Sequence, residues 1–132
     1  MKKQRRPLMA LAIDDSSPSH LVGMIRDALP EYYVNCRTGF SLADLKRSLQ
    51  EGHYDVAIVD FSLNQTEVNW RSDAVTAAEW IQEAQPDCIR VGISGFGNLA
   101  LYFEEDGLYH LVLDRVDRNE IKKLRQGLRK LL

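Results

Sequence analysis

The stretch Tyr54-Asp55-Val56-Ala57-Ile58-Val59-Asp60-Phe61-Ser62-Leu63 decides the fold of this chain. Val56 to Val59 is a continuous apolar run without alternation, which is typical of a strand in a parallel sheet that is covered by helices on both faces. The run ends at Asp60, whose charge would be costly inside a core. It is favourable at the carboxyl end of a strand, where ligands bind in open α/β sheets. The stretch predicts a central strand with a functional acid at its end.

The remaining chain alternates strands with helices. Strands are predicted over 8–13, 32–37, 89–93 and 109–113. Helices are predicted over 18–29, 42–51, from Ser72 or Asp73 to Ala84, over 98–103, and from an Asp117–Glu120 capping box to the end of the chain. Five strand–helix repeats predict an α/β fold of the flavodoxin-like (βα)5 type, a doubly wound parallel sheet of strand order 2-1-3-4-5.

Composition restricts the class of protein. The 132 residues suit one domain, here 8–132, preceded by a basic tail over 1–7 that is either solvated or contacts phosphate. A net charge of −2 gives no general attraction to nucleic acid or membrane, and no apolar run approaches the roughly 20 residues of a membrane span. Cys36 and Cys88 are expected to be buried thiols, and the scattered histidines argue against zinc. We expect a cytoplasmic protein with no output domain after the last helix.

Polar residues follow four of the predicted strands. They are Asp14 and Asp15 after the first strand, Asp60 after the third, Ser94 after the fourth, and Asp114 with Arg115 after the fifth. In a sheet of order 2-1-3-4-5 the first and third strands are neighbours, so their carboxylates converge at the switch point of the sheet. Carboxylates that close together require a cation, and Mg²⁺ prefers such oxygen ligands. A carboxylate beside Mg²⁺ can act as nucleophile toward a phosphoryl group, whose oxygens Ser94 would help to hold.

Each of these residues also has a simpler explanation. An acid between a strand and a helix most often caps the helix, and only the complete set of acids with Ser94 favours a phosphoryl site. Ser16, Ser17 and Ser19 could instead form a phosphate cradle of the kind found in flavodoxin-like flavin binders. The acids immediately before these serines argue against a bare phosphate there.

The chain resembles the receiver domains of response regulators in two-component signalling from about Leu8 to Leu132. The resemblance is carried by Ala-Ile-Asp14-Asp15, Asp-Val-Ala-Ile-Val-Asp60, Gly-Ile-Ser94-Gly-Phe-Gly and Val-Asp117-x-x-Glu120-Ile. It implies that Asp60 is the phosphoacceptor and that Ser94 moves toward the phosphoryl group. It also implies a Mg²⁺ site formed by Asp14, Asp15, Asp60 and the backbone carbonyl of Ser62, and a partner that is a histidine kinase or a phosphotransfer protein.

The chain departs from the receiver pattern in the fifth strand. Receivers usually carry Lys-Pro where this chain has Asp114-Arg115. Asp114 in the place of the lysine would oppose phosphorylation, whereas Arg115 could bind the phosphoryl group bidentately if the strand has already ended. The expected aromatic switch residue is missing, because Leu111 or Val112 lies at its position. The loop 62–71 lacks the usual Met-Pro and Gly and is longer than usual, and we expect it to have a function.

Three functions therefore compete. The first is a stand-alone phosphorylatable receiver that signals to a downstream protein, with a homodimer through the fourth helix, fifth strand and fifth helix, where Leu99, Tyr102 and Phe103 are apolar. The second is a pseudo-receiver whose partner recognises the fold and not its phosphorylation. The third is a metal-dependent phosphohydrolase, which the absence of Asp-x-Asp at Asp60 disfavours. None of them requires a membrane or direct contact with nucleic acid.

Overall fold

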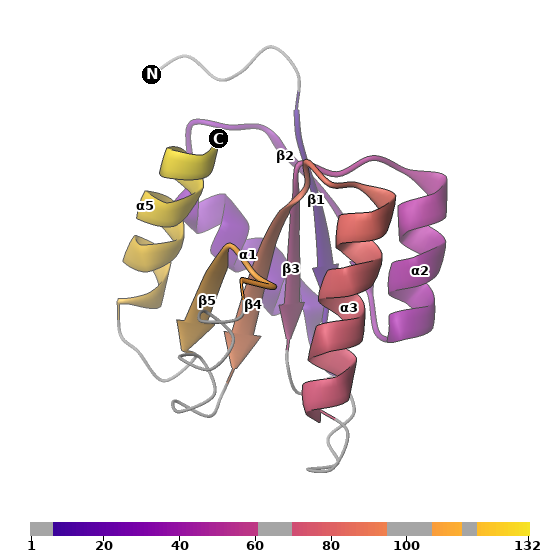
Figure 1. The fold of residues 1–132 in the computed structure, drawn as a ribbon. Helices are drawn as coiled ribbons and strands as arrows, with labels where there is room; N and C mark the ends of the chain where they lie inside the picture. The colour runs from indigo at the N-terminus through magenta and orange to yellow at the C-terminus, as the bar shows by residue number, and fades with distance from the viewer. Residues whose placement is uncertain (1–6, 61–69, 95–106, 115–118) are drawn as a thin grey trace.

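The protein is a five-stranded parallel sheet between two layers of helices, described here from a computed structural model. The structure describes residues 7–60, 70–94, 107–114 and 119–132. The sheet order is β2-β1-β3-β4-β5, as predicted. Its strands all point toward one edge, the lower one in Figure 1. The strands are β1 (Leu8–Ile13), β2 (Val34–Gly39), β3 (Val56–Asp60), β4 (Ile89–Ser94) and β5 (Leu111–Asp114).

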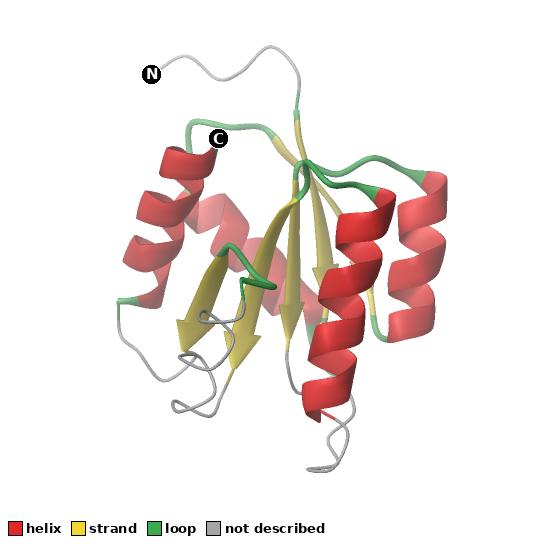
Figure 2. Cartoon of the chain, viewed as in Figure 1, coloured by secondary structure: helices red, strands yellow, loops and turns green. Residues whose placement is uncertain are grey.

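Helices cover both faces of the sheet, as Figure 2 shows. Helices α1 (Pro18–Ala28) and α5 (Glu120–Leu131) pack together on one face, and α2 (Leu42–Glu51) and α3 (Trp70–Ala84) pack together on the other. Strand β3 lies in the middle of the sheet, and each of its five residues is buried. The unbroken apolar run of this strand is therefore explained by helices on both sides.

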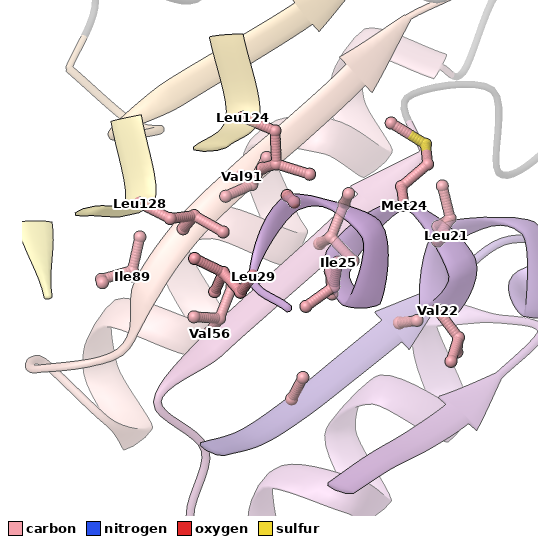
Figure 3. Close-up of a cluster of buried hydrophobic side chains, with 14 of the residues drawn as sticks. Leu21, Val22, Met24, Ile25, Leu29, Val56, Ile89, Val91, Leu124 and Leu128 are labelled. Carbon is pink, nitrogen blue, oxygen red and sulfur yellow. The ribbon is translucent and has the colours of Figure 1, made fainter. Parts of the chain in front are cut away.

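Each face of the sheet has its own hydrophobic core. In the first core, Ile25 and Leu29 pack over Val56 of β3 and Val91 of β4, and Leu124 of α5 closes the cluster (Figure 3). The second core lies under α2 and α3 and joins Leu45 and Ile81 to residues of β1, β3 and β5, among them Ala57 and Val59. Alternation along β3 thus sends Val56 and Ile58 to the first core and Ala57 and Val59 to the second.

Several element boundaries differ from the sequence predictions. Helix α3 begins at Trp70, inside the stretch predicted to be loop, so Ser72 and Asp73 lie within its first turn. Acids are favourable in a first turn as well as at a cap, and for this reason residue type alone misplaced the start. Helix α5 begins at Glu120 with Asn119 as its N-cap, which corrects the Asp117–Glu120 capping box. Strands β2 and β5 begin two residues later than predicted, and the predicted helix 98–103 lies outside the described residues.

The predicted start of α2 is confirmed. The Ser41 hydroxyl accepts the backbone N–H of Asp44 at 3.2 Å, and the Asp44 carboxylate accepts the N–H of Phe40 at 2.8 Å, so the two side chains cap α2 reciprocally. Cys36 and Cys88 are free thiols. Cys88 is buried as predicted, whereas Cys36 is partly exposed, because it lies on the edge strand β2, and this corrects the expectation that both are buried. Burial raises the pKa of the Cys88 thiol to about 12. Within the described ranges no helix has the length and apolar character needed to cross a membrane.

Arginines of α5 attach this helix to the end of α1. The Arg125 side chain donates to the backbone carbonyls of Ala28 at 3.1 Å and Asp27 at 3.0 Å, which satisfies acceptors that a helix end leaves free. Arg129 donates to both carboxylate oxygens of Glu31, at 2.9 and 3.0 Å. These contacts join segments almost one hundred residues apart in sequence and orient α5 against the sheet.

The Glu31–Arg129 pair is expected to make stability depend on pH. The hydrogen bonds from Arg129 hold the pKa of Glu31 below its ordinary value of 4.5. The pair therefore stabilises the fold above the unfolded-state pKa, and its contribution is lost as the pH falls through the folded-state value. Urea unfolding should show Glu31→Gln less stable than the native protein at neutral pH, by a small amount, and this difference should shrink as the pH is lowered below 4.5. An unchanged difference over this pH range, or the same loss in an Arg129→Met background, would contradict this account.

Candidate functional site

The carboxyl ends of four strands bring the sequence-predicted residues to one edge of the sheet. Asp60 is the last residue of β3 and lies in register with Ile93 of β4. Ser94 is the last residue of β4 and lies in register with Asp114, the last residue of β5. Ile13 of β1 is in register with Val59, so Asp14 follows β1 beside Asp60. The strand order thus assembles the edge that the sequence predicts.

Asp14 is buried at the end of β1, with 2% of its surface exposed. Its backbone N–H donates to the carbonyl of Gly39 at 3.1 Å, which joins the ends of β1 and β2. Its carboxylate accepts the backbone N–H of Ser16 at 3.1 Å and the Ser16 hydroxyl at 3.4 Å. These bonds form an Asx turn, which directs the chain into α1 and holds the carboxylate at the edge of the sheet.

Gly39 allows this close approach of β2. A Cβ atom at this position would lie 2.8 Å from Cδ1 of Ile13 and 2.8 Å from Cβ of Asp44. Real Cβ contacts are not that short, so a larger residue would push β2 or α2 away from the end of β1. The glycine is needed here because of the limited space beside Asp14.

The neighbouring carboxylates affect the ionisation of Asp15. Its pKa is raised above the ordinary value, first by burial, then by a hydrogen bond with the carboxyl group of Asp14, and then by the charges of Asp14 and Asp60. These causes identify Asp14, Asp15 and Asp60 as electrostatic neighbours. Like charges at this range oppose one another's ionisation, so the site gains free energy from a bound cation.

The side chain of Asp60 combines burial with a position at the edge of the sheet. Asp60 is 2% exposed and ends a strand whose other residues are all buried and apolar. Burial raises the energy of a carboxylate, and a partner or a cation must offset that cost. A buried carboxylate with neighbouring acids is a suitable nucleophile once cationic charge is supplied.

The carboxylate oxygens at this edge are the type of ligand that Mg²⁺ prefers. The described side chains include no group of three His, Cys, Asp or Glu residues arranged to hold a metal ion. Mg²⁺ retains several waters and needs only one or two carboxylates, so the adjoining Asp14 and Asp15 fit it without a third side chain. Ser62 and Arg115 lie outside the described residues, and their predicted roles stay predictions.

Two features of the site were not anticipated from sequence. Ser16 holds the Asp14 carboxylate, and the Gly39 carbonyl holds the Asp14 backbone. The contact of Ser16 could have been found from the sequence, because an Asp-x-Ser pattern after a strand favours an Asx turn. The contact of the Gly39 carbonyl had no local signal, because Gly39 lies on another strand.

Comparisons with known proteins identify the fold. No protein-family model matches the sequence, and no curated protein matches it. A response regulator from Thermotoga maritima is 15% identical, with 96% of this chain and 98% of that chain covered and a TM-score of 0.70. The signal receiver domain of an HD domain-containing protein from Pseudomonas fluorescens Pf-5 is 18% identical, with 96% and 98% covered and a TM-score of 0.68. The Thermotoga maritima response regulator TrrA, crystallised with Mg²⁺ and BeF, is 14% identical over 100% of both chains, with a TM-score of 0.63. The chain therefore has the fold of a response-regulator receiver domain.

Proposed function

We propose that this protein is a receiver domain that accepts a phosphoryl group on Asp60. The observation that carries the proposal is the pair of buried carboxylates, Asp14 and Asp60, at the ends of adjoining strands, with Asp15 in electrostatic range of both. Burial strengthens the attraction of these acids for a bound cation, which would in turn attract an incoming phosphoryl group. The fold they occupy is the fold of response-regulator receivers.

The proposed reaction is a transfer between two side chains. A carboxylate oxygen of Asp60 attacks the phosphorus of a phosphohistidine on a histidine kinase or phosphotransfer protein. The P–N bond breaks, its electron pair stays on the imidazole, and the aspartate becomes an acyl phosphate. Asp14 and Asp15, with the Ser62 carbonyl, would hold Mg²⁺, which supplies positive charge for the phosphoryl oxygens. Ser94 and Arg115 are the proposed donors to those oxygens.

The proposal includes the setting of this reaction. The phosphodonor is a protein of the cytoplasm, and the phosphorylated domain acts on a downstream protein by contact. A homodimer is proposed through β5, α5 and the predicted helix 98–103, which lies outside the described residues. Leu111 occupies part of this surface on β5 and packs against the core beneath α5.

Phosphorylation of Asp60 is directly testable. Incubation with Mg²⁺ and a small acyl phosphate such as acetyl phosphate should add one phosphoryl group to the native protein, measured by intact mass. Asp60→Ala should add none, because among the described residues no other carboxylate ends a strand next to β1. Asp27→Ala in α1 is the matched control and should behave as the native protein does. No adduct on the native protein, or an adduct that survives Asp60→Ala, would refute the proposal.

A pseudo-receiver is the second candidate, and one observation favours it. The strand register places Asp114 beside Ser94, at the edge where a phosphoryl group would require a cation. If the native protein takes no phosphoryl group, a partner that binds equally well to the Asp60→Asn protein and without Mg²⁺ would establish this alternative.

A further inference from the structure

Asp114 is the charged residue at the end of β5, on the same edge of the sheet as Asp60. Its Cα lies in register with Ser94, and Asp60 is in register with the residue before Ser94, Ile93. Asp114 and Asp60 are thus two strand spacings apart and offset by one residue, which places their Cα atoms about 10 Å from each other. Asp114 is partly buried, so solvent screens its charge incompletely.

The edge already carries three acids before Asp114 is counted. Asp14 and Asp60 both act electrostatically on Asp15. Phosphorylation of Asp60 replaces a single negative charge by a phosphoryl group with nearly two. A fourth acid at the same edge makes that step less favourable and makes the binding of a cation more favourable.

We propose that Asp114 regulates the site by charge, so that it lowers the phosphorylation of Asp60 and strengthens the binding of Mg²⁺. This inference rests on the function proposed above and goes beyond it, because it assigns Asp114 two effects of opposite sign. Asp114 need not touch the reacting atoms, since its charge acts across β4. The protein would therefore bind Mg²⁺ readily while it remains largely unphosphorylated.

The size of the effect follows from the separation. The one-residue offset directs the two side chains to opposite faces of the sheet, so their charges are about 10 to 15 Å apart. At an effective dielectric constant of 20 to 40, a unit charge at that distance changes an equilibrium by about two- to fifteenfold. Asp114→Asn should thus increase the rate of phosphorylation by roughly that factor at saturating Mg²⁺ and weaken Mg²⁺ binding by at least as much. Asp114→Lys should shift both quantities further in the same directions. Both changes should diminish at high salt, because the charges are partly exposed.

The experiment compares variants of residue 114 that differ in charge. Phosphorylation with acetyl phosphate is followed by intact mass, and Mg²⁺ affinity is measured by titration calorimetry on the same samples. Asp114→Glu retains the charge and should match the native protein. Asp87→Asn is the matched control, because Asp87 is exposed in the turn before β4, at the opposite edge of the sheet. Urea unfolding of each variant verifies that it is folded.

Opposite shifts in the two measurements would support the proposal, because damage to the fold would weaken both. Unchanged Mg²⁺ affinity in Asp114→Asn and Asp114→Lys, or a loss of Mg²⁺ affinity together with slower phosphorylation, would overturn it. If no variant accepts a phosphoryl group, the proposed function fails. The Mg²⁺ titrations then still decide whether the Asp114 charge acts on this edge.

Discussion

Replacing Asp14 by asparagine is expected to reduce Mg²⁺-dependent phosphorylation of Asp60 by on the order of 100-fold, at least as much as the loss of a residue that supports a metal ligand. The amide oxygen of asparagine can still accept the Ser16 N–H that now bonds to Asp14 at 3.1 Å. The Asx turn is therefore retained, and the substitution removes one negative charge. Calorimetric titration with Mg²⁺ and intact-mass phosphorylation assays measure the loss.

The same substitution should raise stability when no metal is present. Asp14 is buried beside Asp15 and Asp60, so its charge repels theirs. Removing it should increase the free energy of unfolding in metal-free buffer by about 1 kcal/mol. Asp14→Ala is the contrasting variant, because it removes the charge and also the acceptor of the turn. A loss of stability in Asp14→Asn would contradict this prediction. It would show that the hydrogen-bond partners of the Asp14 carboxylate stabilise it by more than the neighbouring acids destabilise it.

Replacing Gln85 by leucine should destabilise the protein by about 2–4 kcal/mol, although Gln85 lies at the edge of the sheet opposite to the acids. Its side-chain carbonyl accepts the N–H of Tyr54 at 2.8 Å, and its amide donates to the carbonyls of Gly52 at 2.6 Å and Leu49 at 3.3 Å. Gln85 is 6% exposed. Leucine would leave these backbone groups without their partner in a place with little access to water.

The comparison for this prediction is another glutamine nearby. Gln82 is exposed on α3, so Gln82→Leu should change the free energy of unfolding by less than about 0.5 kcal/mol. Urea unfolding of both variants decides the matter. Equal stabilities would show that water replaces the Gln85 side chain at the start of β3.

The Gln85 network holds the start of β3, at the opposite end of this strand from Asp60. Gln85, which follows α3, binds the end of α2 and Tyr54, two residues before β3. Asp60 lies at the other end of β3, only a few residues from Tyr54. We expect Gln85→Leu to lower stability without changing the phosphorylation rate of the protein that remains folded, because no bond of Gln85 reaches the carboxyl edge.

Fold class and strand order were predictable because they depend on patterns that lie close together in the chain. The apolar run Val56–Val59 requires cover on both faces, and alternating strands and helices then allow few arrangements. The positions of Asp14 and Asp60 at strand ends followed from the same patterns. Helix starts were less predictable, because Ser72, Asp73 and Asn119 can stand at a cap or in a first turn with similar energies.

The amino-acid sequence by itself determined that this protein is a parallel α/β domain with acids at the ends of its strands. The reason is that buried strands and amphipathic helices each produce a recognisable pattern of apolar residues within a short stretch of sequence. Only the tertiary structure decided which acids act on one another, that Asp114 is in register with Ser94, and that Gln85 and Arg125 satisfy backbone groups on distant elements. These relations join residues up to 98 positions apart. Their energies depend on separation in space, on burial and on the surrounding charges, none of which a local pattern contains.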